Sequence, residues 1–345
     1  MSVPRGALPV LAALSLLALA AASASHGAID IAPGRTATIL AQETGLLAAS
    51  ADIPERDRVV VWFVRTPRVL AAGLVGAALA LSGALLQGLF RNPLASPSVI
   101  GVSSGAALGA TLAIALGLAA VSIWAVPVFA CVGAALAGFV VYALATRAGR
   151  ATLATLLLCG VAVNSITGAA TSLVLTLSTQ DWEIGQQIVF WLMGGLANRT
   201  WEHVGILLPF LAVAVAIGSG FTRELDVMLT GEESALALGV DTAHTQRWVL
   251  VAASGAAGAA VAVAGVLGFV GLIVPHMVRL VYGPGHRSLL PASLWAGAGL
   301  LILMDWLSRA VLAPREISLG ILTAGLGGPF FLYLLLRYRK REGLA

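Results

Sequence analysis

Long apolar runs, interrupted by short polar segments, make up most of this chain of 345 residues. In the longest of them, the 55 residues between Arg91 and Arg147 include no Asp, Glu, Lys or Arg. A bilayer core about 30 Å thick takes about 20 apolar residues of helix, so this run is long enough for two spans and a turn. The same criterion predicts ten helical spans, at 7–27, 69–90, 99–119, 124–146, 152–177, 203–221, 247–267, 270–283, 291–312 and 317–336.

The apolar runs are continuous, which favours helices over the strands of a membrane barrel, whose segments of about 10 residues alternate between apolar and polar. A further apolar piece, Gln187–Leu196, is too short to cross a bilayer and predicts a re-entrant or interfacial helix. Charged residues are 10% of the chain, against about a quarter in soluble domains, and the mean hydropathy is +0.95. The predicted fold class is therefore an all-α integral membrane protein.

Arginines and lysines are distributed unevenly between the two predicted sides of the membrane. Twelve of the 20, including those in Arg337–Arg341, fall on the side that contains both chain ends. Since cytoplasmic loops are enriched in basic residues, both termini are expected in the cytoplasm. The first span also has features of a cleavable secretory signal, with Arg5 before the apolar run and the small residues Ala22–Ser25 after it. The even number of spans favours a retained helix.

Several basic residues nevertheless lie at the predicted outer ends of the spans. Arg65 and Arg68 begin the second span, Arg309 ends the ninth, and Arg315 lies in the following loop. Such side chains can extend to lipid headgroups, or they can form a cationic rim for an acidic protein, because exposed charges steer association. Asp305 lies four residues before Arg309 and predicts an ion pair with it. Outside the short C-terminal tail, no basic run with interleaved aromatic residues indicates nucleic-acid binding.

The longest polar interruption after residue 70 covers residues 222–241. Thr230 and Glu233 have the spacing of a capping box at a helix N-terminus, and Gly239 is a helix stop signal. Two brief amphipathic helices are therefore predicted at the cytoplasmic surface, within 222–244. Their apolar faces suit a groove on another protein.

Three phrases follow one another along the chain: Arg91–Pro97 with Gly101–Ala106, then Gly231–Ala235 with Leu238–Val240, then Gly268–Arg279. In this order, and with ten spans, they resemble the signatures of the permease subunits of type II ABC importers, which import iron siderophores, haem or cobalamin. The resemblance covers nearly the whole chain.

The resemblance implies a single transmembrane permease domain over 1–345, built from two inverted five-helix repeats at approximately 1–199 and 200–345. It implies a homodimer in the bacterial inner membrane, with two cytoplasmic ABC ATPase subunits and a periplasmic substrate-binding protein as partners. In this family, outer arginines receive glutamates of the binding protein, and the matching residues are Arg65, Arg68 and Arg309. Coupling helices bind in a groove of the ATPase, and the matching residues are Glu232, Glu233, Ala235, Leu238, Gly239 and Asp241.

The family's pathway lies on the dimer axis, between the fifth and tenth spans. The resemblance assigns to it the polar residues Asn164, Ser165, Thr167 and Thr323, and to a gate loop before the fifth span Arg147, Gly149 and Arg150. The polar residues of the spans can instead bond to neighbouring helices, because unsatisfied polar groups in a bilayer are costly.

Prolines interrupt both halves of the chain. Pro93 and Pro97 follow the second span, and Pro275 is expected near the junction of the seventh and eighth, which are corresponding positions in inverted repeats. Small residues such as Gly105 and Gly109 are expected to let helices approach closely.

The chain contains no Walker phosphate-binding loop, so ATP and Mg²⁺ are expected on a separate ATPase subunit, and this chain is expected to be a transport subunit and not an enzyme. Cys131 and Cys159 lie inside spans without metal-ligand spacing, and the five histidines are scattered. His276 lies in one of the family phrases and is expected to be structural. No cofactor or metal site is expected in the chain, and iron would travel only within the substrate.

Haem is the favoured cargo for two reasons. The sequences of Arg91–Ala95 and Gly101–Ala110 resemble those of haem permeases, and an apolar pathway suits a flat hydrophobic compound. Ferric siderophores and cobalamin are alternatives that use the same mechanism. An ion-gradient-driven secondary transporter also uses inverted repeats and broken helices, but it would normally bury carboxylates in its spans, and none occurs between Asp241 and Asp305. An intramembrane enzyme would need a cluster of ionisable groups, whereas those of this chain are isolated.

Overall fold

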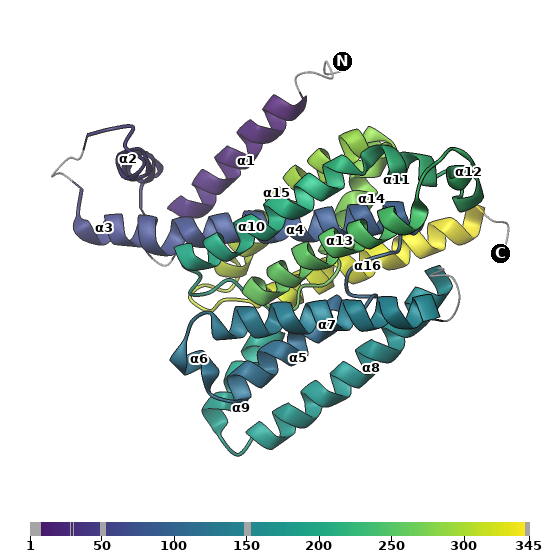
Figure 1. Cartoon of the computed structure of the whole chain (residues 1–345). Helices are drawn as coiled ribbons and strands as arrows, with labels where there is room; N and C mark the ends of the chain where they lie inside the picture. Colours follow the sequence, from purple (N-terminus) through teal and green to yellow (C-terminus); the bar gives the residue numbers. More distant parts are fainter. Residues whose placement is uncertain (1–7, 28, 30, 49–52, 148–152, 342–345) are drawn as a thin grey trace.

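The computed structural model describes residues 8–27, 29, 31–48, 53–147 and 153–341 (Figure 1). Every regular element in these ranges is a helix, which confirms the all-α prediction. The first half contains α1 (Leu8–Ser25), α2 (Pro33–Glu43), α3 (Glu55–Val59), the π-helix η1 (Val60–Arg65), α4 (Thr66–Leu89), α5 (Val102–Ala115), α6 (Leu118–Val121), α7 (Ala125–Arg147) and α8 (Leu153–Ser178). The second half contains α9 (Trp182–Leu192), α10 (Trp201–Gly220), α11 (Thr222–Met228), α12 (Glu232–Ala237), α13 (Thr242–Ala264), α14 (Val270–Tyr282), α15 (His286–Ala310) and α16 (Leu319–Arg341).

Most predicted spans coincide with apolar helices. Six helical segments are long and apolar enough to cross a membrane, namely Glu55–Leu89, Ala125–Arg147, Thr155–Ser178, Trp201–Gly220, Thr242–Ala264 and His286–Ala310. Shorter apolar helices lie at the remaining predicted spans, at Ala13–Ser25, Val102–Ala115, Val270–Tyr282 and Leu319–Tyr333. Six such segments indicate a multi-pass membrane protein. That all ten helices cross the membrane stays a prediction.

Helix α4 forms the core of the bundle, with α10, α13, α14 and α15 packed against it. Of the 18 most apolar consecutive residues in the segment Glu55–Leu89, 83% are buried inside the bundle. The polar side chains of α4 bond to the helices around it: Ser82 Oγ donates to the Ala253 carbonyl oxygen at 2.7 Å, and Gln87 Nε2 donates to that of Leu272 at 3.1 Å. These bonds satisfy polar groups for which a bilayer offers no water.

Glycines bring the helix backbones into direct contact. A Cβ built on Gly76 of α4 would lie 2.1 Å from the carbonyl oxygen of Gly297 in α15, and one on Gly297 would lie 2.3 Å from that of Gly76. Gly105 of α5 is equally close to α7, since its Cβ would lie 2.3 Å from the carbonyl oxygen of Gly133. The expectation that Gly105 and Gly109 allow close approach is therefore confirmed; a Cβ on Gly109 would lie 2.0 Å from the Phe129 carbonyl oxygen.

Two irregular segments each join a long helix to a short one. The first connects α4 to α5 and ends at Gly101, whose φ is 83°. The second connects α13 to α14 and runs from Gly265, with φ 70°, to Phe269, with φ 67°. Pro275, predicted near the junction of the seventh and eighth spans, lies inside α14 and therefore follows the break without forming it. Gly265 produces the break: its backbone is left-handed, and a Cβ there would lie 2.3 Å from the Trp191 carbonyl oxygen.

The apolar piece predicted at 187–196 overlaps the C-terminal half of helix α9 and extends beyond it. The helix begins earlier than predicted because Asp181 caps it, its Oδ1 accepting the backbone N–H of Glu183 at 3.0 Å. It ends at Leu192, shortly before Gly194 with φ 71°. An eleven-residue helix remains too short to span a bilayer.

The bundle has two ends of different character. In Figure 1, α11, α12 and the C-terminal end of α16 lie at one end, and α2 and α3 lie at the other. We call the end with α11 and α12 the inner end and the end with α2 and α3 the outer end.

Candidate functional site

A buried ion cluster lies at the outer end, where α4 begins and α15 ends. The Asp305 side chain of α15 is 0% exposed. Its Oδ1 accepts a hydrogen bond from Arg68 Nε at 2.9 Å, and its Oδ2 lies 3.0 Å from Nη2 of Arg309, one helical turn later. The predicted pair of Asp305 with Arg309 is confirmed, and Arg68 is a second partner that the sequence did not indicate.

Arg68 also binds Glu316, in the loop between α15 and α16. Its Nη1 donates to Oε1 and its Nη2 to Oε2, both at 2.9 Å. Burial favours the neutral acid, but the hydrogen bonds from Arg68 and the charges of Arg68 and Arg309 outweigh it and hold the pKa of Glu316 below its usual value. Sequence reasoning missed Glu316; the available signal was an acidic residue directly after Arg315 in an outer loop.

The other two predicted docking residues bond to the end of α1. Arg65 is only 7% exposed and donates to the carbonyl oxygens of Ala24 at 3.0 Å and Ser25 at 2.7 Å, and also to that of Ile29. Arg309 donates to Ser23 Oγ at 2.7 Å and to the His26 carbonyl oxygen at 3.0 Å. The structure thus brings Arg65, Arg68 and Arg309 to one end of the bundle, with most of their donors used inside the protein.

Arg199 adds a further charge beside this cluster. Its Nε donates to the Val263 carbonyl oxygen at 2.6 Å. Burial, and then repulsion from Arg68, lower the pKa of Arg199 to about 10, so it remains protonated at neutral pH. The cluster contains four arginines, Arg65, Arg68, Arg199 and Arg309, but only two carboxylates, Asp305 and Glu316, so the cluster itself has an excess of positive charge, which suits an acidic partner.

Helix α12, at the inner end, stops where the sequence predicts. Gly239 has φ 82°, its N–H donates to the Leu236 carbonyl oxygen at 3.0 Å, and the Val240 N–H donates to that of Ala235 at 3.0 Å, as in a Schellman motif. The predicted capping box is wrong. Gly231 is the N-cap, and Thr230 Oγ1 donates to the Val227 carbonyl oxygen at 2.8 Å because it lies in the turn that ends α11.

The predicted coupling residues divide into exposed and structural groups. Leu238 is 70% exposed, Glu233 is exposed and Glu232 is half-buried. Ala235 is buried in the core, and the Asp241 side chain caps α13 by accepting the His244 N–H at 2.9 Å. The surface offered to a partner is therefore centred on Leu238.

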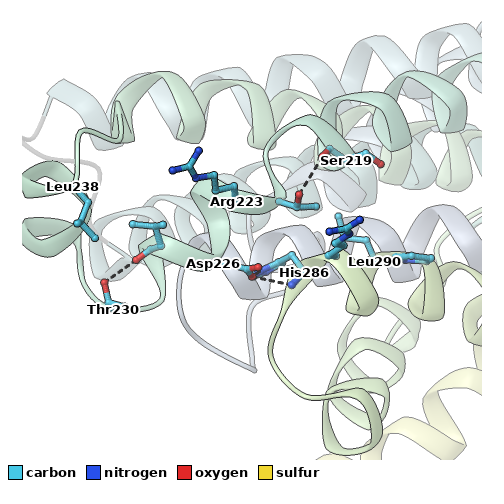
Figure 2. Close-up of a pocket in the computed structure, with 11 residues that line it drawn as sticks. Ser219, Arg223, Asp226, Thr230, Leu238, His286 and Leu290 are labelled. Carbon is cyan, nitrogen blue, oxygen red and sulfur yellow. Dashed lines mark hydrogen bonds and ion pairs between the residues drawn. The ribbon is translucent and has the colours of Figure 1, made fainter. Parts of the chain in front are cut away.

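A pocket of about 740 Å³ lies between α11 and the start of α15 (Figure 2). Oδ1 of Asp226 in α11 lies 2.6 Å from Nδ1 of His286 and accepts the His286 backbone N–H at 2.8 Å. Leu238 lies on the other side of the pocket (Figure 2). Helix α15 is thus bonded to α11 at its inner end and to Arg68 of α4 at its outer end.

The predicted pathway residues all have hydrogen bonds within the chain, those of Ser165, Thr167 and Thr323 to their own helices and those of Asn164 to a neighbouring segment. Asn164 Nδ2 donates to the Ser98 carbonyl oxygen at 3.1 Å, and its Oδ1 accepts from Ser104 Oγ at 2.6 Å. Ser165 donates to the Val161 carbonyl oxygen at 2.9 Å, Thr167 to that of Val163 at 2.8 Å, and Thr323 to that of Gly320 at 3.2 Å. Asn164 therefore joins α8 to the segment before α5, and the pathway role of these residues stays a prediction.

Helix α8 exposes a long apolar face at the edge of the bundle (Figure 1), formed by Leu158, Val161, Ile166, Leu173 and Leu177. Arg147 of the predicted gate loop is exposed at the end of α7, whereas Gly149 and Arg150 lie outside the described residues. Within the ranges that the structure describes, no group of three His, Cys, Asp or Glu residues could hold a metal ion.

Known proteins resemble this chain over most of its length. The model of the FecCD transport family matches residues 14–337. A cobalamin import system permease protein of Halobacterium salinarum is 48% identical over 84% of this chain and 76% of its own length. A hemin transport system permease protein of Yersinia pestis is 40% identical over 82% of this chain and 85% of its own length.

A solved structure shares the fold. It is described as an inward-facing conformation of a metal-chelate type ABC transporter, and it superimposes with a TM-score of 0.82 at 33% identity, covering 96% of this chain and 100% of its own. The three sequence phrases, the helical bundle and these relatives agree. The chain belongs to the FecCD transport family and is a multi-pass permease of the ABC importer type.

Proposed function

We propose that this chain forms, as a homodimer, the membrane pathway of a type II ABC importer that moves a metal tetrapyrrole into the cytoplasm. Two ATPase subunits with ATP and Mg²⁺ would bind α11 and α12, and a substrate-binding protein would dock at the opposite end, on the outer side of a bacterial inner membrane. Both termini would then lie in the cytoplasm. Iron or cobalt enters only as part of the cargo.

One observation carries this proposal: a single helix, α15, bonds to the candidate ATPase-binding elements through His286 and to the basic outer cluster through Asp305. Partners at both ends of the bundle would therefore act on one rigid element. The family resemblance places α8, which corresponds to the predicted fifth span, at the dimer axis, where the second copy of the chain would cover its exposed apolar face.

For the cargo, haem is the sequence-based choice, and ferric siderophores and cobalamin are the alternatives; the relative from Halobacterium salinarum supports cobalamin. Haem and cobalamin are both large metal macrocycles. Mass spectrometry of the compound that the cognate binding protein retains on purification separates the two. A linear ferric siderophore in that position would contradict the tetrapyrrole proposal while leaving the importer mechanism intact.

The importer mechanism itself is tested in proteoliposomes that contain the permease with its co-encoded ATPase. We expect the cargo-loaded binding protein to stimulate ATP hydrolysis and uptake. A rate of ATP hydrolysis that no binding protein changes, together with uptake that depends on an ion gradient, would instead establish a secondary transporter.

Removing charge from the outer cluster should weaken docking. We expect Arg68→Gln and Arg309→Gln each to lower the affinity for the binding protein roughly tenfold, more at low than at high salt, because the lost attraction is electrostatic. Arg35→Gln is the matched control, since Arg35 is half-exposed and pairs with Asp57 at 2.7 Å. Binding should be measured on permease whose thermal unfolding is unchanged; affinities equal to those of the control would remove these arginines from the interface.

The C-terminal turn of α12 provides a test of coupling. We expect Gly239→Pro to reduce transport and stimulated ATP hydrolysis at least about tenfold, because proline holds φ near −65° and Gly239 needs 82°. Gly239→Asn is the control, since Asn tolerates the left-handed region, and it should retain most activity. Normal transport by an assembled Gly239→Pro complex would remove α12 from the ATPase contact.

A further inference from the structure

The guanidinium of Arg68 is almost fully used by its own chain. Nε is bound to the buried Asp305, and the end formed by Nη1 and Nη2 is bound by both oxygens of Glu316. A two-point contact of this kind matches the planar fork of arginine and is among the stronger hydrogen-bonded pairs. Glu316 therefore occupies the Nη1 and Nη2 end of Arg68, which is the end that a carboxylate of another protein would bind best.

The two carboxylates on Arg68 differ in accessibility. Asp305 is 0% exposed, whereas Glu316 is 44% exposed, and Arg68 itself is only 12% exposed. Asp305 belongs to the core of the cluster, because its departure would leave Arg68 and Arg309 without a shared counter-charge. Glu316 can turn into water with its charge solvated.

The backbone around Glu316 is held independently of this pair. The Ile317 N–H donates to the Ser308 carbonyl oxygen at 2.9 Å, and the Arg315 N–H donates to that of Leu312 at 2.9 Å. Leu319, at the start of α16, donates its N–H to the Gly194 carbonyl oxygen at 3.1 Å. Release of Glu316 from Arg68 therefore requires a side-chain rotation rather than movement of the loop.

We propose that Glu316 is an internal substitute for the docking carboxylate of an acidic partner: it occupies Arg68 in the undocked permease and is exchanged for that carboxylate on docking. The proposal rests on the proposed docking function and adds a competing group to it. Exchange leaves the number of charge-assisted bonds to Arg68 unchanged, so the loss of the Glu316 contact offsets part of the affinity that Arg68 gives to docking. The internal carboxylate thus weakens binding and favours release of the partner.

The test measures the affinity of the cognate binding protein for the complete permease–ATPase complex in lipid nanodiscs. We expect Glu316→Gln to tighten binding about three- to tenfold, since the competitor has lost its charge. Glu55→Gln is the matched control, because Glu55 is an exposed carboxylate near the outer end and its removal changes the net charge equally. The control should change affinity less than about twofold.

A double-mutant cycle with Arg68→Gln separates competition from general electrostatics. In that background, Glu316→Gln should lose its effect, because no guanidinium remains to compete for. Glu316→Asp, which keeps the charge but is too short for the two-point contact, should tighten binding by a smaller factor and provides the test if Glu316→Gln folds poorly.

The outcomes distinguish the two proposals. If Arg68→Gln leaves affinity unchanged, docking at this cluster is wrong. If Arg68→Gln weakens binding but Glu316→Gln matches Glu55→Gln or weakens binding, docking stands and the exchange is wrong. A gain that persists without Arg68 also overturns the exchange.

Discussion

Replacing Asp305 with Asn is expected to lower the free energy of unfolding by about 3–5 kcal/mol. The side chain is completely buried and is shared by Arg68 and Arg309, at 2.9 Å and 3.0 Å. Removing its charge leaves two largely buried guanidiniums with one partly exposed partner, Glu316. Thermal unfolding in mild detergent, with the yield of monodisperse protein, measures the loss.

Glu316→Gln is the control for this prediction, since a pair with a half-exposed carboxylate contributes only about 1 kcal/mol. Adding Arg68→Gln to Asp305→Asn should recover part of the loss, because it removes one uncompensated charge. An Asp305→Asn permease as stable as the unmodified protein would show that the buried cluster contributes nothing net to folding.

Substituting Gly76 with Ala is the second change with a large expected effect, a loss of about 3 kcal/mol or more through overpacking. The new Cβ would lie 2.1 Å from the Gly297 carbonyl oxygen and 2.8 Å from the Leu301 Cβ, so α4 and α15 would have to separate. Both helices are in the core, and neither contact involves a flexible side-chain end that could move away.

Gly205→Ala is the matched control, because Gly205 lies inside α10 and nothing lies within 4 Å of a Cβ built there. It should leave stability unchanged or raise it by about 0.5–1 kcal/mol, since alanine favours the helix. Thermal unfolding of the two variants side by side gives the comparison. Equal stabilities would mean that α4 and α15 are not held at backbone contact distance.

Local sequence signals predicted some helix boundaries and failed at others. Gly239 stops α12 because a left-handed residue closes a helix whatever surrounds it. Thr230 and Glu233 have the spacing of a capping box, yet Thr230 belongs to the preceding turn and Gly231 is the cap. Pro275 lies inside α14, after the break, whereas Gly265 lies at the break itself, where a Cβ would come within 2.3 Å of the Trp191 carbonyl oxygen.

The candidate site shows the same division. Asp305 and Arg309 are four residues apart on one helix, so their pairing follows from helix geometry alone. Arg68 and Glu316 are 248 residues apart, and Asp226 and His286 are 60 apart, so no local spacing could reveal either contact. The sequence predicts Arg65 and Arg309 at an outer rim. It does not indicate their bonds to the end of α1, because these depend on the packing of α1 against α15.

The all-helical membrane architecture, the order of the apolar helices and the family can be read from the chain alone, because a span needs a continuous apolar run and the family phrases are local. The carboxylate that each arginine binds, the glycines that are in contact and the anchoring of α15 at both ends follow only from the packing of the helices. Those outcomes depend on helices far apart in the chain meeting at backbone distance. There, a single Cβ or an unpaired charge costs more free energy than any local preference supplies.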